Sequence, residues 1–242
     1  MAGLARLQIT TESVSAVDEL GFDYILKWSK RRRSLAIEVA PDEVVVRAPF
    51  GVNKGYIHEF VVSKRSWVVS KLGLQAHRQA EVPQRQYQAG EVIPWLGEAY
   101  RLQVEPGART RITWQEKAIH IELAPRAQLK TQLLNWYRQQ AEHLLADKTS
   151  YFAECLGVSV ASIQFRKTKT KWGHCTREGV IQYNWLIALA PESVVDYLVA
   201  HEVSHRRYMN HGPRFWQTVE KLCPDYLQQR QWLKRYGHTL VL

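Results

Sequence analysis

Long apolar runs are missing from this sequence, and cysteine is scarce. In its 242 residues no hydrophobic stretch approaches the roughly 18–20 residues that cross a bilayer, and the start MAGLARLQIT has no apolar core followed by a small-residue cleavage site. The cysteines, Cys155, Cys175 and Cys223, are too few for a disulfide scaffold and never follow a C-x-x-C spacing. These absences argue against a membrane partner and a secreted, disulfide-rich domain, and we expect a cytoplasmic protein.

Acidic residues are outnumbered, and no internal repeat or low-complexity segment is detected. Hydrophobic residues at 45% and charged residues at 23% are typical of a globular protein. The chain has 33 Lys and Arg residues and 23 Asp and Glu residues, which gives a net charge of +10. A positive field of this kind attracts phosphates, nucleic acid or acidic surfaces, although it also serves solubility alone. Nucleic acid therefore stays open as a partner.

The residue patterns predict an α+β protein in two parts, with a boundary near residue 125. Residues 1–125 form a β-rich N-terminal subdomain with one helix, and residues 126–242 form the second subdomain. Its long helix starts near 126, carries an apolar stripe and is stopped by Gly157. The remaining expected elements are strands at 23–30, 34–40, 43–49, within 91–123, at 162–168 and at 179–185, and helices at 54–79, 191–209 and 213–236.

Residues 201–205 spell H-E-V-S-H. Positions i and i+4 of a helix share one face about one turn apart, so the imidazoles of His201 and His205 can bind one metal ion. Glu202 lies about 100° further round the helix, where it can reach a water on that ion without binding the ion. In zinc hydrolases of this H-E-x-x-H type the metal lowers the pKa of the water and the glutamate takes its proton. Glu202 is the candidate general base.

His211 is the candidate third ligand, because a catalytic zinc ion usually has three protein ligands. A straight helix would carry His211 about 9 Å beyond His205 along the axis, so the chain must turn between them, and Asn210 and Gly212–Pro213 suit such a turn. Zn²⁺ is the expected cofactor, although three histidines also accept Mn²⁺, Co²⁺ or Ni²⁺. In the alternative, the two helical histidines continue an apolar helix face and form hydrogen bonds in a core.

Tyr208 occupies the position at which metzincins, which share the 201/205/211 spacing, have glycine, so we do not assign the chain to the metzincins. Its hydroxyl is a candidate donor to a developing oxyanion. The alternative is a tyrosine that packs at the helix end.

The motifs together resemble the YgjP-like family of metal-dependent hydrolases, a zincin group related to SprT-type proteases. The matching segments, in chain order, are R-x-S-L-x-I-x-V at 32–39, K-W-G-H-C at 171–175, I-Q-Y-N-W-L-I-A-L-A-P at 181–191, H-E-V-S-H at 201–205 and N-H-G-P-R-F-W at 210–216. The resemblance implies a zincin-like catalytic half, with His201, His205 and His211 as metal ligands and Glu202 as the acid and base. His174 departs from the family, which usually has serine there. It is a candidate proton donor or fourth contact near the metal, or else a histidine of a surface loop.

A row of lysines precedes this motif. Lys167, Lys169 and Lys171 share one face of an extended chain and could hold the phosphates of a substrate. The alternative is a solvated strand edge, because lysines discourage edge pairing.

Three functions remain open. The first is a zinc metallopeptidase that acts on a peptide or protein substrate, held extended by an edge strand such as Val180–Trp185. The second is a metal-dependent pyrophosphatase that acts on a nucleoside triphosphate such as UTP, an activity assigned to members of the family. The third is a DNA-associated protease like the SprT relatives. We favour the peptidase, on motif logic and on the family's name.

Overall fold

The structure is a computed structural model that describes residues 10–40, 43–168 and 170–242. The chain divides into two compact units, Met1–Glu81 and Val82–Leu242. The boundary expected near residue 125 falls inside the second unit, because the strands before it share one hydrophobic core with the helix after it. Ile93, Leu102, Ile119 and Ile121 of those strands are buried in the same cluster as Leu133 and Tyr137 of the helix.

The first unit is a four-stranded sheet covered by helices. Its strands are β1 (Thr11–Val14), β2 (Tyr24–Ser29), β3 (Ala36–Val39) and β4 (Val44–Pro49), and its helices are α1 (Val17–Leu20), α2 (Lys54–Ser63) and α3 (Arg65–Glu81). The strand order is β1-β2-β4-β3, with β2 and β4 parallel and the other pairs antiparallel. Alternate strand residues such as Leu26 and Val46 pack in a core with Ile57, Val61 and Val68 of the helices. The single helix expected at 54–79 is interrupted at Lys64, whose backbone (φ −106°, ψ 4°) leaves the helical region.

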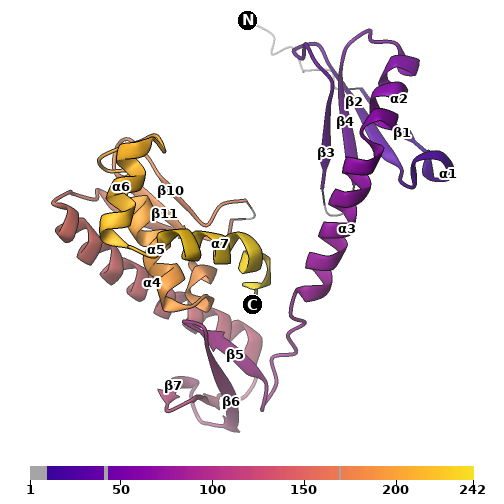
Figure 1. The fold of residues 1–242 in the computed structure, drawn as a ribbon. Helices are drawn as coiled ribbons and strands as arrows, with labels where there is room; N and C mark the ends of the chain where they lie inside the picture. Colours follow the sequence, from indigo (N-terminus) through magenta and orange to yellow (C-terminus); the bar gives the residue numbers. More distant parts are fainter. Residues whose placement is uncertain (1–9, 41–42, 169) are drawn as a thin grey trace, which may run out of the picture. The chain divides into compact units, whose positions relative to one another are not determined.

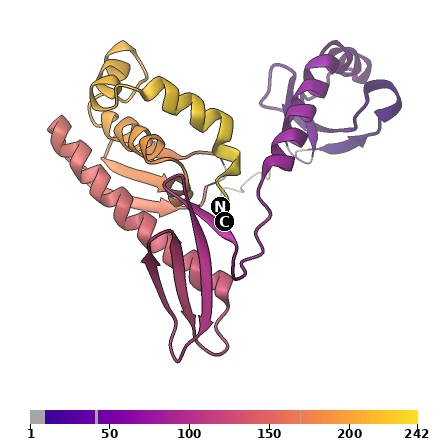
Figure 2. The ribbon, with the colours of Figure 1, turned by 60° about the horizontal axis from the view of Figure 1, so that its bottom comes forward.

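The second unit begins with a similar sheet, visible beside α4 in Figure 2. Its strands are β5 (Val92–Trp95), β6 (Glu98–Pro106), β7 (Arg111–Gln115) and β8 (Ala118–Leu123), in the order β5-β6-β8-β7. Leu96 and Gly97 both have positive φ, at 49° and 79°, as a tight hairpin turn requires. These strands lie within the 91–123 region in which the sequence predicted hairpins.

The two four-stranded sheets have the same topology. In each, the middle pair is parallel and both outer pairs are antiparallel. Each sheet is followed by a helical stretch of the same length, because the 10 residues of α2, Lys64 and the 17 residues of α3 equal the 28 residues of α4 (Leu129–Leu156). β3 and β7 begin at residues 36 and 111, and the helical stretches begin at 54 and 129, so both pairs are 75 residues apart. The structure therefore contains a repeat of topology that the sequence did not indicate.

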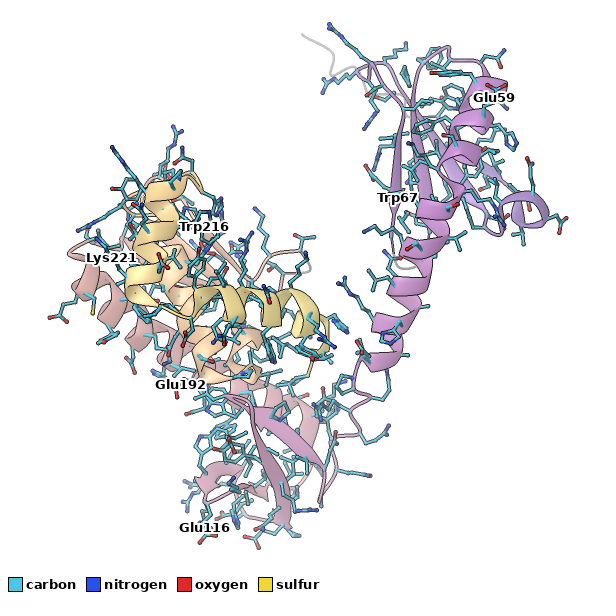
Figure 3. The ribbon with its side chains drawn as sticks, viewed as in Figure 1. Glu59, Trp67, Glu116, Glu192, Trp216 and Lys221 are labelled. Carbon is cyan, nitrogen blue, oxygen red and sulfur yellow. The ribbon has the colours of Figure 1, made fainter. Side chains whose placement is uncertain are left out.

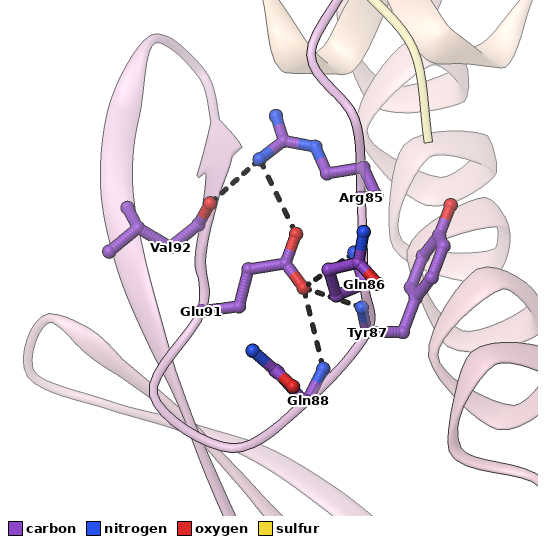
Figure 4. Close-up of polar contacts among 6 residues, drawn as sticks. All are labelled: Arg85, Gln86, Tyr87, Gln88, Glu91 and Val92. Carbon is purple, nitrogen blue, oxygen red and sulfur yellow. Dashed lines mark hydrogen bonds and ion pairs between the residues drawn. The ribbon is translucent and has the colours of Figure 1, made fainter.

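The segment that leads into the second unit is fastened to that unit by Glu91 (Figure 4). One carboxylate oxygen, Oε2, accepts hydrogen bonds from the backbone N–H groups of Gln86, Tyr87 and Gln88. Tyr87 has a φ of 55°, which turns successive N–H groups toward one point. Arg85 donates to the carbonyl of Val92 at 2.8 Å and lies 3.9 Å from the other carboxylate oxygen of Glu91.

The rest of the second unit consists of helices around a short sheet and carries the segments from residue 171 to residue 216 that resemble the family (Figure 1). The elements are β9 (Ser162–Arg166), β10 (Gly173–Cys175), β11 (Val180–Asn184), a 3₁₀ helix at Trp185–Leu189, α5 (Glu192–Ser204), α6 (Pro213–Leu222), α7 (Tyr226–Tyr236) and a 3₁₀ turn at Gly237–Thr239. The long helix α4 ends at Gly157, whose φ is 64°, as predicted. A long helix, a short sheet and a helix bearing H-E-x-x-H confirm the α+β class and the zincin-like half.

Several expected elements differ in detail. β10 lies between the strands expected at 162–168 and 179–185, where no strand was expected. It pairs antiparallel with β11, and β9 and β11 are parallel neighbours. The sheet order is β10-β11-β9, so Val180–Trp185 cannot offer the substrate edge that the sequence suggested. α5 ends at Ser204 rather than near Met209, and the stretch 213–236 is divided at Pro224, which cannot continue a helix.

None of the helices among the described residues combines the length and the apolar character that crossing a membrane requires.

Candidate metal centre

α5 is the central element of the site and is buried along most of its length. It packs against α4, α6, α7 and β10. Its first turn is tied to α4 by Lys148, whose Nζ lies 2.6 Å from Oδ1 of Asp196 and 2.8 Å from Oε1 of Glu192. Figure 3 labels Glu192 at the start of α5. The helix that carries the motif is thus fixed by packing against several elements and by the ion pairs of Lys148 near its start.

His201, His205 and His211 converge, and one ring nitrogen from each lies within 4.8 Å of the other two. The helix ends after Ser204, and the turn that follows brings His211 back until its Nε2 is 3.1 Å from Nε2 of His201. Two ligand nitrogens of a tetrahedral zinc site, with bonds of about 2.0–2.1 Å, are separated by about 3.3–3.4 Å. The three histidines therefore form a group that could hold a metal ion.

Hydrogen bonding prepares one of these rings to bind a metal. Nδ1 of His205 lies 3.0 Å from the carbonyl oxygen of Tyr208. A carbonyl oxygen only accepts, so Nδ1 carries the proton and Nε2 keeps its lone pair, the usual arrangement of a histidine ligand. Nδ1 of His201 is buried and has no hydrogen-bond partner in the described parts of the chain. This pattern does not fit the alternative of two core histidines satisfied by hydrogen bonds.

The surroundings favour the neutral imidazole at His201 and His205. Burial, with the neighbouring His205 and His211 as further causes, lowers the pKa of His201 to about 3. Burial also lowers the pKa of His205, against the opposing effect of its bond to Tyr208. A metal binds only the neutral imidazole, so the lowered pKa values favour metal binding at neutral pH.

Glu202 lies against the strand β10 and is only 4% exposed. Burial raises the pKa of its carboxyl to about 8, and the charge of Lys171 acts in the opposite direction. Directly opposite is Gly173, where a Cβ atom would lie 2.6 Å from both Cγ and Cδ of Glu202. The carboxyl group occupies the space that any other residue at position 173 would need.

Aromatic side chains from α6 and α7 support the three histidines. Phe215 is fully buried, and its ring centroid lies 4.5 to 4.9 Å from those of the histidines. Trp216, labelled in Figure 3, stacks on His211 at 5.6 Å and on Tyr226 at 5.4 Å. The guanidinium carbon of Arg230 lies 4.6 Å from the centre of the Trp216 ring. The third histidine is therefore backed by a stack of rings.

Two arginines anchor the turn that follows His205. Arg206 donates to the carbonyl oxygens of Ser159, Thr176 and Arg177 at 3.0, 3.4 and 3.1 Å. Arg207 donates to the carbonyl oxygen of Leu156 at the end of α4. The first arginine joins the end of α5 to the turn between β10 and β11.

Tyr208 and His174, the other predicted site residues of this region, do not contribute a side-chain atom to the group of three histidines. The ring of Tyr208 packs against the cluster of Tyr197, Phe215 and Val219, and its carbonyl oxygen rather than its hydroxyl contacts a histidine. His174 is exposed on β10 and lies outside the group of converging ring nitrogens, although its charge acts on His205.

The structure describes two of the three lysines that were predicted to hold phosphates, and these two have different surroundings. Lys167 donates to the backbone oxygen of Leu242 at 3.3 Å, and Lys171 is exposed within electrostatic reach of Glu202. Lys169 lies outside the described residues.

Some supporting residues had no signal of their own in the sequence. Gly173, Phe215 and Trp216 lie in the segments that resemble the family, but no spacing rule connects them with the histidines. Arg206 directly follows His205 and looks like an ordinary surface charge until its three carbonyl partners are known.

Comparison with known proteins agrees with the resemblance. Residues 33–236 match the family described as "YgjP-like, metallopeptidase domain". No curated protein matches the chain. Among solved structures, the crystal structure of the metallopeptidase zymogen of Pyrococcus abyssi abylysin is similar at 19% identity with a TM-score of 0.36, over 40% of this chain and 99% of that chain.

Proposed function

This chain belongs to the YgjP-like metallopeptidase domain family, and from that premise we propose that it is a zinc-dependent peptidase with Glu202 as general base. The observation that carries the proposal is the convergence of His201, His205 and His211 beside a buried carboxyl group. A structural zinc site is usually closed by four ligands and rich in cysteine. Here three histidines would supply three ligands, as in a catalytic site, and Glu202 would have no task in a structural site.

The three histidines would hold the zinc ion through the ring nitrogens that face one another. A bound zinc ion supplies Lewis acidity, which lowers the pKa of water and polarises a carbonyl group. The chain supplies the rest. Tyr208 keeps the ring of His205 in the correct tautomer through its carbonyl oxygen, and Phe215 and Trp216 keep the rings in place.

Glu202 would take the proton of the attacking water and return it to the leaving amine. General acid–base catalysis is most efficient when the pKa of the group lies near the working pH. Burial raises the pKa of Glu202 to about 8, so its carboxyl group holds a proton more readily than a free glutamate does, as the transfer to the leaving amine requires. Gly173 leaves room for the carboxyl group, and Lys171 limits the rise in its pKa. His174 remains a candidate second proton donor because it directly follows Gly173 on β10 and is exposed.

The peptide substrate would lie along β10. This strand is at the edge of its sheet, pairs with β11 on one side and includes Gly173, which touches Glu202. An extended peptide can add to such an edge through main-chain hydrogen bonds. That placement would bring its carbonyl group next to the histidines and the carboxyl group at once.

Glu202→Gln tests the proposal. The zinc-loaded protein is incubated with casein, an unfolded protein, and cleavage is followed by gel electrophoresis. We expect the wild type to cut casein and the variant to retain its zinc but lose cleavage by about 10²–10⁴-fold. Full activity in the variant would rule out its role as base, and an inactive, zinc-loaded wild type would contradict the peptidase proposal.

The wild type and the Glu202→Gln variant also distinguish peptidase activity from pyrophosphatase activity. Phosphate or pyrophosphate release from UTP is measured beside casein cleavage. Of the lysines predicted to hold phosphates, Lys171 lies within electrostatic reach of Glu202, whereas Lys167 donates a hydrogen bond to the backbone oxygen of Leu242. We therefore expect no UTP hydrolysis, and hydrolysis that depends on Glu202 would favour the pyrophosphatase.

A further inference from the structure

Positive charge in the first unit gathers at one end of its sheet. β2 and β4 are parallel, so their C-terminal ends lie side by side, with Ser29 opposite Pro49. The turn Lys30–Arg33 follows β2 directly, and Phe50 follows β4. The backbone N–H of Phe50 donates to the carbonyl oxygen of Ser29 at 3.2 Å, which holds the two strand ends together.

The charge continues onto the face of the sheet away from the helices. Lys27 and Arg47 are register partners on that face, while their neighbours Leu26 and Val46 are buried in the core on the opposite face. Together with Arg32 they line a cavity of about 320 Å³. We call this region the basic end; its residues are Lys27, Lys30, Arg31, Arg32, Arg33, Arg47 and Phe50.

One carboxylate, Glu38, lines the same cavity and is outnumbered. Arg47 binds it through two nitrogens at 2.7 and 2.9 Å. This hydrogen bonding, with the charges of Arg47, Arg32 and Lys27 behind it, lowers the pKa of the Glu38 carboxyl. Three cations therefore converge on one anion, and the cavity keeps an excess of positive charge.

Phe50 adds an exposed aromatic ring to this charge. It is 60% exposed, although it is a large apolar side chain. Nζ of Lys30 lies 5.6 Å from the centre of its ring. An exposed ring within a group of cations is the arrangement on which proteins stack unpaired bases while they hold the phosphates between them.

We propose that the basic end of the first unit binds single-stranded nucleic acid, with a base stacked on Phe50 and the phosphates on the surrounding lysines and arginines. A single strand is favoured over a duplex because stacking on Phe50 needs an unpaired base. It is favoured over an anionic membrane because one phenylalanine gives little apolar area for insertion. This binding uses neither the histidines nor Glu202 and goes beyond the proposed peptidase activity.

The test measures binding of the full chain to a fluorescein-labelled (dT)₂₀ strand by fluorescence anisotropy between 50 and 200 mM salt. Single strands give a slope of log K against log salt of about −0.7 per phosphate contact, so contacts from six cations predict a slope of about −4. A mixed 20-base-pair duplex and vesicles of phosphatidylserine are measured in parallel. The strand should bind more tightly than either.

Two sets of charge reversals locate the site. Lys30→Glu, Arg31→Glu and Arg33→Glu change three exposed side chains of the basic end, and together they should halve the slope and weaken binding at least tenfold. The matched control, Lys64→Glu, Lys71→Glu and Arg78→Glu, changes the net charge equally on and beside α3. It should keep the slope of the wild type.

Phe50→Ala should weaken strand binding about tenfold with an unchanged salt slope, because it removes stacking and leaves the charge. Circular dichroism and a melting curve confirm that each variant is folded. An equal loss in the control set would show attraction by net charge alone and overturn the proposal. Tighter binding to the duplex or to vesicles, or no binding to the strand at 50 mM salt, would overturn it as well.

Discussion

The carboxyl group of Glu202 on α5 fills the space where a side chain at Gly173 on β10 would lie. A Cβ atom at position 173 would lie 2.6 Å from Cδ of Glu202 and closer still to its Oε1. Side-chain atoms do not approach a Cβ to such distances, so the carboxyl group keeps its position only while residue 173 is glycine. The strand that is proposed to hold the substrate thus also determines where the proposed base can lie.

Gly173→Ala should therefore abolish peptidase activity without loss of zinc. The added methyl group displaces the carboxyl group, and we expect a loss of about 10²–10⁴-fold, as for removal of a general base. The measurements are casein cleavage and zinc content by atomic absorption. Gly212→Ala is the matched control, because a Cβ there meets nothing closer than 4.0 Å. Retained activity in Gly173→Ala would show that Glu202 can work from a shifted position.

His211→Ala should remove most of the zinc, because only His201 and His205 of the converging group would remain. The loss of affinity should exceed the about 10–100-fold that follows loss of a partner outside the ligand set. His174→Ala is the control, since His174 lies outside the group of converging nitrogens, and it should keep one zinc ion per chain. Zinc content measured after dialysis distinguishes the two. The opposite result would identify His174 as a ligand in place of His211.

Trp216→Ala should weaken zinc binding about 10–100-fold while all three ligands remain. The indole stacks on His211, and its loss frees that ring to rotate. Trp216→Phe keeps part of the stack and should lose less. Competition with a chromogenic chelator gives the affinities. Trp67→Ala is the control, since Trp67 is 45% exposed in the first unit, and an equal effect there would refute the stacking argument.

Arg206→Ala should lower the free energy of unfolding by about 2–3 kcal/mol. Hydrogen bonds from a charged group contribute about 1.5–3 kcal/mol each, but the guanidinium is partly exposed and its three carbonyl acceptors can bind water after its removal. Urea denaturation of the metal-free protein, followed by tryptophan fluorescence, measures the change. Arg177→Ala removes an exposed side chain from the turn that Arg206 anchors and should have little effect. A change below about 0.5 kcal/mol in Arg206→Ala would show that the anchor is dispensable.

The group of histidines that could hold a metal ion could be predicted from the sequence because the relation among them is local. His201 and His205 are related by the repeat of one helix, and the turn that carries His211 back is indicated by Gly212 and Pro213. The contact of Gly173 with Glu202 could not be predicted in this way, since it joins a strand and a helix that are distant in the sequence. Nor does a three-residue strand such as β10, which contains glycine, produce a recognisable alternation.

Strand pairing was the weakest part of the prediction. The sequence pattern indicates that 162–168 and 179–185 are strands, but it does not indicate whether two strands run parallel. The edge of the sheet was consequently assigned to Val180–Trp185, whereas that segment includes the central strand β11. Lys64 and Pro224 interrupt helical stretches that the apolar spacing alone shows as continuous.

The repeated topology of the two sheets bears on the history of the chain. Two successive segments with the same strand order, the same pairing senses and helical stretches of equal length are what a tandem duplication of one gene segment produces. After such an event the copies are free to diverge, and only α4 continues into further strands and helices that carry the histidines. The ancestral module would then have been a sheet and a helix without a metal centre, and catalysis a later acquisition of its second copy.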